Sequence, residues 1–530
     1  MRIKMKKVIY LIIGCLGFVS CGDFLKEYSQ DLVYASSLED MDEVLIGNGY
    51  MKHEGYPSFV FSSGQANAVY YMWLNVMDDD IQEFGSGPYS VGNSGNPSEY
   101  LRSFYEWSKV PFQNEKGVPY DDENWKKLYA HISYSNVIIS QVDEFSEDSK
   151  GAKRRIKGEA QFLRAAYYYL LVNFYANPYV KATAETDPGV PLKLIEKVDD
   201  KYYSRNSIAE VYNQIVKDLK DAAENLTGVE QPTVYRVNEA AARILLSRVY
   251  LYMGEWQLAA DECDRVMKLG IHLSNLNDFD LTETIGVPGD KLRVTKAQYM
   301  NTSQSPEVLF TQGSNGCPYL MFDKTSIGRY AVSQELCDLY TKYPEVTDLR
   351  LTGFFSKSQV NGNYRFVRKT SDVLADMTTF DCFIIRSAEA YLNKAEAEAM
   401  LGGDAITPIK KLLENRFAGG QIPAIDGLSG KELVEFIRDE RRRELCFESQ
   451  RWFDLRRYAV CVKYPESKEI DHVSYLPATA ANANGIPNGT YRLKRYEEER
   501  AYVLPIPGYE IVFNRGELVD NPEREDREAI

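Results

Sequence analysis

Residues 438–458 read RDERRRELCFESQRWFDLRRY, which places seven arginines and five carboxylates in one short segment. On an α-helix each arginine would have a carboxylate within one turn, where side chains three or four residues apart meet. Ile437, Leu445, Trp452 and Leu455 would form an apolar stripe along the same helix. The pairs expected from this spacing are Asp439 with Arg443, Arg441 with Glu444, Glu448 with Arg451, and Asp454 with Arg457.

Three roles compete for this segment. Nucleic-acid binding needs unpaired arginines, and the formal net charge of −15 would repel phosphates. Acid–base catalysis by Glu444 or Glu448 is disfavoured because carboxylates neutralised by arginine are poor general acids. The favoured interpretation is a structural charge network, since a guanidinium binds carboxylates bidentately even when it is partly buried. The predicted members are Glu440, Arg441, Glu444, Glu448, Arg451, Asp454 and Arg456.

The first twenty residues have the form of an export signal. A basic MRIKMKK is followed by an apolar VIYLIIGCLGFV, and Ser20 precedes Cys21. This order predicts a lipoprotein signal peptide over residues 1–20 with Cys21 as the acylated N-terminus; an ordinary cleaved secretory signal is the alternative. Acyl chains contribute about 0.8 kcal/mol per buried methylene, so two or three chains would make the attachment permanent.

Apolar residues recur at spacings of three and four over long segments, which predicts a mostly helical chain. Residues 51–122 and 270–380 are irregular, with short strand-like runs such as EVLFTQ and YRFVRK, and residues 459–530 form an extended tail. The predicted helices cover residues 123–145, 153–176, 207–226, 238–254, 381–401, 404–417 and 430–458.

Two windows suggest that the helices form repeated pairs. LLSRVYLYMGEWQLAADECDRVMKL (245–269) places Leu246, Tyr250, Gly254 and Trp256 at the spacings of a tetratricopeptide repeat. YLNKAEAEAMLGGDAITPIKKLL (391–413) follows the pattern less well, because its turn shifts the register. The spacing predicts a solenoid of packed helix pairs.

Four ordered blocks resemble the SusD/RagB family. Glu440–Tyr458 resembles the family's C-terminal signature, and GEAQFLRAAYYYLLVNFYANPYV (158–180) resembles its long N-terminal helix and turn. CGDFL (21–25) resembles the start of the mature protein, and LPIP (504–507) resembles the terminal block. Ser449-Gln450 departs from the family pattern, in which a glycine-containing step precedes the position of Arg451.

The resemblance implies a fold and a location. The expected fold is mostly α, with about four tetratricopeptide-like helix pairs, an irregular loop-rich ligand-binding part and few short strands. Residues 21–530 would form a single domain, with its scaffold in 123–269 and 381–458 and its ligand-binding part in 51–122 and 270–380. Members of this family are lipoproteins on the surface of Bacteroidetes that bind nutrients, mostly glycans. The expected location is therefore the outer membrane, lipid-anchored and facing the cell surface, beside a SusC-like TonB-dependent transporter.

Candidate ligand residues are aromatic side chains in the irregular segments, with amides nearby. Sugars present a face of C–H bonds to aromatic rings and a rim of hydroxyls to polar groups. The alternation of YYMW (70–73) also fits a half-buried strand, so packing in the core is the competing interpretation. The candidates are Tyr71, Trp73, Asn75, Tyr89 and Trp107 in the first irregular segment, and Asn315, Tyr319 and Phe322 in the second.

Signals for catalysis and cofactors are weak. The sequence has no G-x-S-x-G, Walker-type or H-E-x-x-H motif, so we expect neither an enzyme nor a bound cofactor. Asp78-Asp79-Asp80 has oxygen ligands suited to a structural Ca²⁺, although a solvated turn is favoured. The expected function is non-catalytic capture of an oligosaccharide or polysaccharide for the transporter. The alternatives are peptide capture by the same fold, a scaffold that binds only protein, and a glycoside hydrolase.

Overall fold

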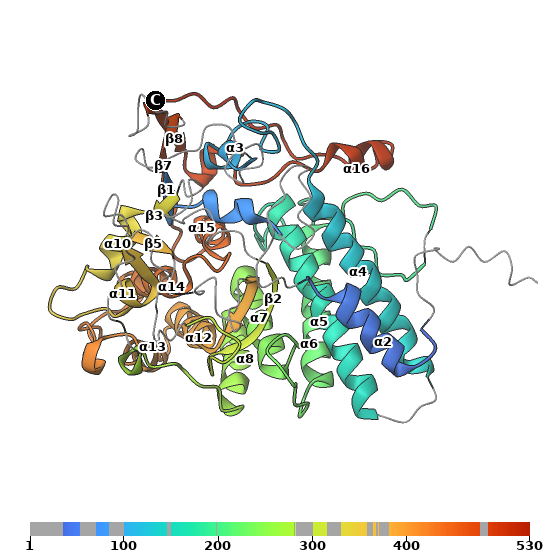
Figure 1. Ribbon diagram of the computed structural model, residues 1–530, viewed down its shortest axis with the longest axis horizontal. Coiled ribbons are helices and arrows are strands. Elements are labelled where there is room, and N and C mark those ends of the chain that lie inside the picture. The colour runs from blue at the N-terminus through green and yellow to red at the C-terminus, as the bar shows by residue number, and fades with distance from the viewer. Residues whose placement is uncertain are drawn as a thin grey trace, which may run out of the picture.

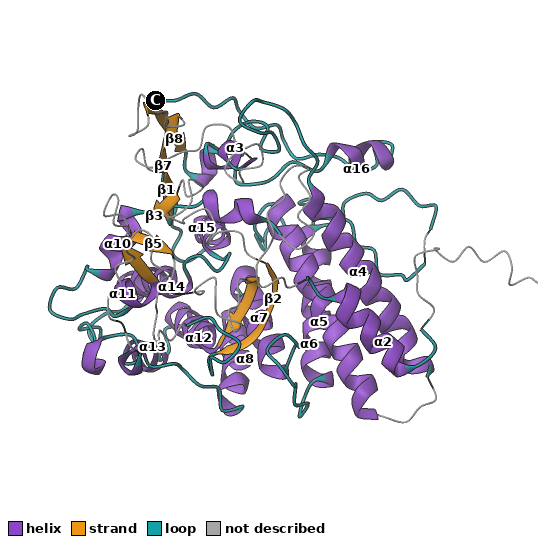
Figure 2. Cartoon of the chain, in the orientation of Figure 1, coloured by secondary structure: helices purple, strands orange, loops and turns teal. Residues whose placement is uncertain are grey.

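A computed structural model describes residues 35–52, 70–83, 100–145, 150–197, 199–279, 281, 300–314, 330–357, 364–366, 369, 381–476 and 486–530. Helices dominate these residues, and the strands among them form two-stranded sheets (Figure 2). The mostly α, tetratricopeptide-like fold class expected from the sequence is confirmed. Over the same residues, no helix combines the length and the apolar composition that crossing a membrane requires.

The scaffold is a row of helices in which each helix packs on the next (Figure 1). α2 (Leu38–Val44) lies against α5, and α4 packs on the same long helix. The row then continues through α6, α7 and α8 to α12, which also contacts α13 and α14. The bounds are α4 (Glu123–Gln141), α5 (Lys150–Tyr175), α6 (Ile208–Asn225), α7 (Glu239–Met253), α8 (Trp256–Lys268), α12 (Ser387–Leu401), α13 (Ile406–Leu413), α14 (Gly430–Leu445) and α15 (Arg451–Ala459).

Local sequence explains where these helices begin and how closely they pack. Ser207 and Glu210 form a capping box at the start of α6, so orphan backbone N–H groups are satisfied. Gly254 ends α7 with φ 73°, a left-handed conformation that glycine adopts without strain. Gly158 allows α5 and α6 to approach, because a Cβ there would lie 2.9 Å from side-chain atoms of Asn225 and Leu226.

Two predicted helices differ from the structure. Residues 381–386 are not helical but form β6 (Asp381–Arg386), which pairs antiparallel with β2 (Val308–Ser314). The segment predicted as one helix over 430–458 is broken into α14 and α15, because Phe447 and Ser449 adopt φ values of 59° and 58°. A left-handed backbone interrupts the α-helical hydrogen-bond ladder, so the two halves point in different directions.

The remaining strands and short helices form the loop-rich part beside the scaffold (Figure 1). β1 (Ile81–Glu83) pairs with β3 (Tyr330–Val332), β4 (Phe355–Lys357) with β5 (Tyr364–Phe366), and β7 (Ile470–Leu476) with β8 (Ile486–Leu493), all antiparallel. The short helices are α3 (Arg102–Tyr105), α10 (Gln334–Tyr340), α11 (Arg350–Phe354) and α16 (Gly508–Phe513), with a 3₁₀ helix at Met72–Val76.

Candidate functional site

A network of ion pairs lies inside the protein, centred on Glu444 of α14. The carboxylate of Glu444 contacts the guanidinium groups of Arg350, Arg386 and Arg416 at 3.1, 3.0 and 2.9 Å. Glu307 contacts Arg386 and Arg416 from the opposite side. All five side chains are 0 to 1% exposed to solvent. The network therefore joins α14 to β6, to α11, which begins at Arg350, and to the segments that carry Arg416 and Glu307.

The charges in this network stabilise one another. Burial alone would favour the neutral form of Glu444, but Arg416, Arg386 and Arg350 hold the pKa of its carboxyl well below the ordinary value. The pKa of Glu448 is also lowered against the effect of burial, by Arg386 and by Lys369 at 2.7 Å. Carboxyls with lowered pKa stay ionised at neutral pH and do not donate a proton, so the arrangement is structural.

The partners within 438–458 mostly differ from those expected from helical spacing. Asp454 contacts Arg457 at 2.7 Å as predicted, but Arg441 contacts Asp454 at 3.0 Å rather than Glu444. The break between α14 and α15 brings Asp454 against α14, which explains this difference. The other expected pairs are also replaced. Asp439 contacts Lys342, and Arg443 contacts Glu440. Glu448 contacts Arg386, and Arg451 contacts Asp79.

Arg456 is an exception, because its guanidinium contacts backbone carbonyls rather than carboxylates. Its guanidinium donates hydrogen bonds to the backbone oxygens of Asn173 and Ala176, at the C-terminal end of α5. The expectation of an acidic neighbour within one turn is wrong for this residue. The last carbonyls of a helix lack intrahelical partners and carry partial negative charge, so a buried arginine there caps α5 and ties it to α15.

Asp78, Asp79 and Asp80 lie in the interior and not in a solvated turn. Their carboxylate oxygens come within 4.8 Å of one another, a spacing that could suit a cation. Two of the three carboxylates already have cationic partners: Arg442 contacts Asp80 at 2.7 Å, and Arg451 contacts Asp79 at 2.7 Å. Burial raises the pKa of Asp78 well above its ordinary value, which favours its neutral form. These contacts favour an ion-pair cluster over a calcium site.

Four of the predicted ligand residues pack in the core. Trp73 is 5% exposed and stacks on Phe104 with ring centroids 5.3 Å apart. Trp107 is 1% exposed, stacks on His472 at 4.2 Å, and donates from Nε1 to the carbonyl oxygen of Met77 at 2.9 Å. Tyr71 and Asn75 are each 2% exposed. The expectation that these four side chains present a surface to sugar is wrong, because all four are buried.

The other ligand candidates lie in segments that the structure does not describe. Tyr89, Asn315, Tyr319 and Phe322 lie outside the described residues, as does Cys21. Residue 84 follows Glu83 at the end of β1, and residue 329 precedes Tyr330 at the start of β3. Glu83 and Tyr330 are directly opposite each other in the β1–β3 pair. The chain segments that carry the two predicted clusters are therefore joined to adjacent strand ends.

A polar cluster lies beneath these strand ends. Arg102 of α3 contacts Glu83, Glu106 and Glu115 at 3.5, 3.3 and 3.4 Å, and it donates to Ser474 Oγ at 2.8 Å. Burial raises the pKa of Glu83 to about 7, and the nearby Arg102 only partly opposes this. The Glu83 carboxylate also accepts a hydrogen bond from the backbone N–H of Tyr475 at 2.7 Å. The cluster thus ties β1 and α3 to β7.

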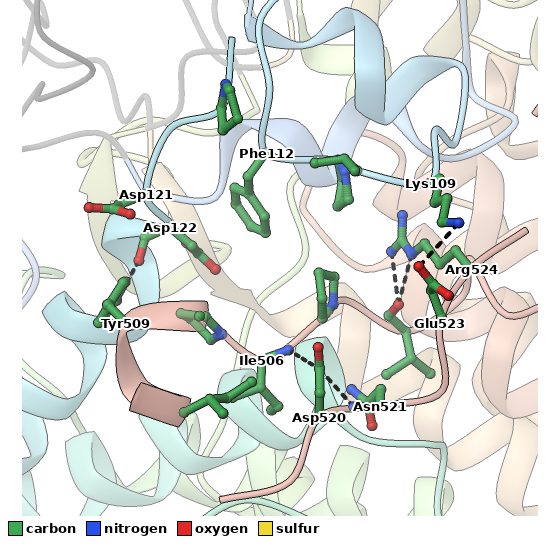
Figure 3. A pocket seen from close by; sticks show the side chains of 18 of the residues that line it. Lys109, Phe112, Asp121, Asp122, Ile506, Tyr509, Asp520, Asn521, Glu523 and Arg524 are labelled. Carbon is green, nitrogen blue, oxygen red and sulfur yellow. Dashed lines mark hydrogen bonds and ion pairs between the residues drawn. The ribbon is translucent and has the colours of Figure 1, made fainter. Parts of the chain in front are cut away.

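A pocket of 390 Å³ opens between the loop at residues 109–122 and the C-terminal block (Figure 3). Phe112 faces the cavity from one wall, and Ile506 and Asp520 lie on the other. Its volume falls in the range of about 300–1,000 Å³ that is typical of ligand pockets. Five prolines, Pro111, Pro119, Pro505, Pro507 and Pro522, line it and restrict its backbone.

The polar groups around this pocket mainly hold the tail in place. Asp122 caps α4 by accepting from the N–H of Asn124, and burial raises the pKa of its carboxyl to about 6. Asp520 accepts from the N–H of Ile506 at 2.6 Å. Arg524 donates to the carbonyl oxygen of Val503, and burial lowers its pKa to about 9. Because these groups are already engaged, the pocket has few polar atoms left for a ligand.

Several of these residues carried no sequence signal. Arg350, Arg386 and Arg416 are isolated arginines in the sequence, and Glu444, which all three contact, lies 94, 58 and 28 residues further along the chain. Glu83 lies beside the acidic run at 78–80, and nothing in its spacing points to Arg102. Only a predicted contact between distant segments could have identified either cluster.

Comparisons with known proteins agree with this architecture. Residues 81–251 match a family model described as starch-binding associating with outer membrane, and residues 341–523 match that of the SusD family. The chain is similar to SusD-like protein P2 of Formosa agariphila, at 25% identity over 75% of this chain and 79% of the relative. The fold is similar to that of a putative sugar binding protein from Bacteroides vulgatus (TM-score 0.67, 24% identity, 93% and 100% of the two chains). It is also similar to that of a laminarin binding SusD-like protein (TM-score 0.56, 21% identity, 92% and 100%). The chain belongs to the SusD/RagB family.

Proposed function

We propose that this protein binds an oligosaccharide or polysaccharide at the cell surface and delivers it, without breaking a bond, to a SusC-like TonB-dependent transporter. Acylated Cys21 would hold it on the outer membrane, with residues 1–20 removed as the signal peptide. Family membership supports this function, as does the match of residues 81–251 to a family described as starch-binding and associating with the outer membrane.

The observation that carries the proposal is the pairing of β1 with β3. Glu83 lies opposite Tyr330, so the segment with Tyr89 and the segment with Asn315, Tyr319 and Phe322 start or end at neighbouring positions. We expect rings from both segments to contribute to recognition of the ligand. Stacking of sugars on rings gives weak binding, in the micromolar to millimolar range or about 4–8 kcal/mol, which suits a protein that must release its ligand.

Absence of catalysis is part of the proposal. The buried carboxylates of Glu444 and Glu448 are held ionised by arginine and lysine, so they are poor proton donors for glycoside cleavage. The segments that would carry the glycan are anchored to a scaffold whose charges are internally neutralised. We therefore propose no catalytic role for Glu444 or Glu448.

A scaffold that binds only protein is the second candidate. The burial of Trp73 and Trp107 favours it, because it removes two of the rings expected at a sugar site. The exposed Val512 and Phe513 of α16, 78% and 70% exposed, also offer an apolar surface. Neither observation identifies a partner, and both are compatible with glycan binding by the outlying segments.

The test is a binding and turnover screen of residues 22–530 against a panel of neutral and acidic polysaccharides. Retardation in affinity gels together with unchanged polysaccharide on product analysis supports the proposal. Binding of peptides alone would favour peptide cargo, and release of oligosaccharide products would establish a hydrolase. Absence of any glycan or peptide binding would leave the protein-binding scaffold.

A further inference from the structure

A second pocket, of 360 Å³, lies between α4, the segment at residues 191–203 and α16. It shares α16 with the pocket of Figure 3, but different residues of that helix line it: Glu510 and Phe513 here, and Tyr509 and Ile511 there. We call it the lysine pocket, because Lys126, Lys193 and Lys201 line it.

The walls of the lysine pocket are fixed by hydrogen bonds. Tyr203 donates from its backbone N–H to Asn514 Oδ1 at 2.8 Å, which joins the 191–203 segment to the residue after α16. Tyr129 of α4 donates from its hydroxyl to the carbonyl oxygen of Pro191 at 2.8 Å. A cavity whose three walls are tied together in this way is preorganised for a ligand.

The charge of this pocket is opposite in sign to that of the chain. Three lysines line it against two acidic residues, Asp199 and Glu510, in a protein with a formal net charge of −15. Lys193 lies 4.0 Å from Asp199. Among the described residues, neither Lys126 nor Lys201 has a carboxylate within 4.0 Å, and Lys201 instead lies 5.2 Å from the ring centroid of Tyr203. Two ammonium groups thus remain available to an anion.

Ring faces and a free acceptor accompany these lysines. Phe513 is 70% exposed at the edge of the pocket, and the half-buried ring of Tyr203 lies beneath Lys201. The Glu510 carboxyl has no hydrogen-bond partner among the described residues, and burial raises its pKa. These groups match those of a charged sugar. The rings suit its C–H faces, the acceptor suits its hydroxyls, and the ammonium groups suit its negative charge.

We propose that the lysine pocket binds a saccharide that carries an acidic group, either a uronate carboxylate or a sulfate. This inference rests on the proposed glycan-binding function and adds a site away from the β1–β3 strand ends. A neutral sugar would leave the two ammonium groups without a counter-charge, whereas an acidic sugar places its anion between them. The attraction is electrostatic and partly exposed, so it weakens as salt increases.

The test is isothermal titration calorimetry of residues 22–530 with three oligosaccharides of similar length. An oligogalacturonate supplies carboxylates, a carrageenan oligosaccharide supplies sulfates, and a laminari-oligosaccharide is neutral. We expect at least one acidic ligand to bind, with an affinity that falls as NaCl is raised. Comparison of the two acidic ligands identifies which anion the pocket takes.

Variants locate the binding. Lys126→Gln combined with Lys201→Gln should lower the affinity for the acidic ligand about tenfold, equivalent to about 1.4 kcal/mol. Phe513→Ala should lower the same affinity several-fold without changing how that affinity depends on salt. Lys197→Gln is the matched control, because Lys197 lies on the same segment with an 81% exposed side chain outside the pocket. It should leave the affinity unchanged, and equal thermal stability of all variants should confirm folding.

The outcomes separate this inference from the proposed function. Binding of acidic sugar that is unaffected by the double variant, or affected equally by Lys197→Gln, overturns the lysine pocket as the site. Binding of only the neutral ligand overturns the inference and leaves glycan capture standing. Absence of binding to every polysaccharide and oligosaccharide overturns both.

Discussion

Glu83, the last residue of β1, lies directly opposite Tyr330, the first residue of β3. Two irregular segments that are more than 200 residues apart in the chain are therefore attached at one point of the fold. Arg102, Ser474 and Tyr475 hold the same point from α3 and β7. The strand pair thus places the end of β1 and the start of β3 side by side, next to α3 and β7.

The Glu83 carboxyl makes stability depend on pH. Its pKa is about 7 in the folded protein against an ordinary value of 4.5. Between these pH values the folded protein keeps a proton that the unfolded chain has released, so the free energy of unfolding falls as pH rises from 4.5 through 7. The loss is roughly 3–4 kcal/mol, from a pKa difference of about 2.5 units at about 1.4 kcal/mol per unit.

Glu83→Gln should remove this loss. We expect the variant to be more stable than the wild type at pH 8 and equally stable near pH 4, as measured by urea unfolding across the pH range. Glu517→Gln, at an exposed position, is the control and should follow the wild type. If the free energy of unfolding changes with pH in the same way for Glu83→Gln and the wild type, Glu83 is not the source of the pH dependence.

The network around Glu444 should be sensitive to removal of its central charge. Glu444→Gln leaves Arg350, Arg386 and Arg416 buried with too little negative charge, which should lower the free energy of unfolding by about 3–5 kcal/mol. Glu435→Gln is the control, because it removes one partner of an exposed ion pair with Lys431. This substitution should change the free energy of unfolding by less than about 0.5 kcal/mol. Similar effects of the two substitutions would argue against a buried network.

Arg456 should contribute through its geometry as well as its charge. Arg456→Lys keeps a cation but loses the planar fork that reaches the carbonyls of Asn173 and Ala176, so we expect a loss of about 1–3 kcal/mol. Amide hydrogen exchange should increase at the C-terminal end of α5. Arg500→Lys, whose guanidinium bonds an exposed carbonyl of Glu523, is the control. Unchanged exchange in α5 would show that Arg456 does not cap this helix.

Calcium should have little effect on this protein at Asp78–Asp80. Arg442, Arg451 and Lys468 already neutralise this cluster, so a divalent cation would have to displace buried ion pairs. We expect the same melting temperature in excess EDTA and in millimolar CaCl₂. A rise in melting temperature with calcium that Asp80→Asn abolishes would identify a metal site there.

The periodicity of the sequence was enough to predict the helices of the scaffold, because their apolar faces repeat at helical spacing. It could not predict the break after Cys446, where Phe447 and Ser449 adopt a left-handed backbone that residues with a Cβ rarely choose. Arg441 therefore pairs with Asp454 across that break rather than along one helix.

The candidate site was harder to predict than the scaffold. The alternation at 70–73 fits both a half-exposed and a buried segment, and only the packing of Trp73 on Phe104 decides between them. Trp107 has polar neighbours in the sequence, yet it stacks on His472, a residue from the opposite end of the chain. Contacts of this kind depend on distant segments, which a local pattern does not encode.

Affinity electrophoresis of residues 22–530 in polysaccharide gels, comparing Tyr319→Ala with Trp107→Phe, tests the division between scaffold and recognition surface most directly. We predict that Tyr319→Ala loses retardation at unchanged melting temperature, whereas Trp107→Phe melts earlier but is retarded as strongly as the wild type. Retained retardation in Tyr319→Ala together with its loss in a folded Trp107→Phe variant would contradict the account.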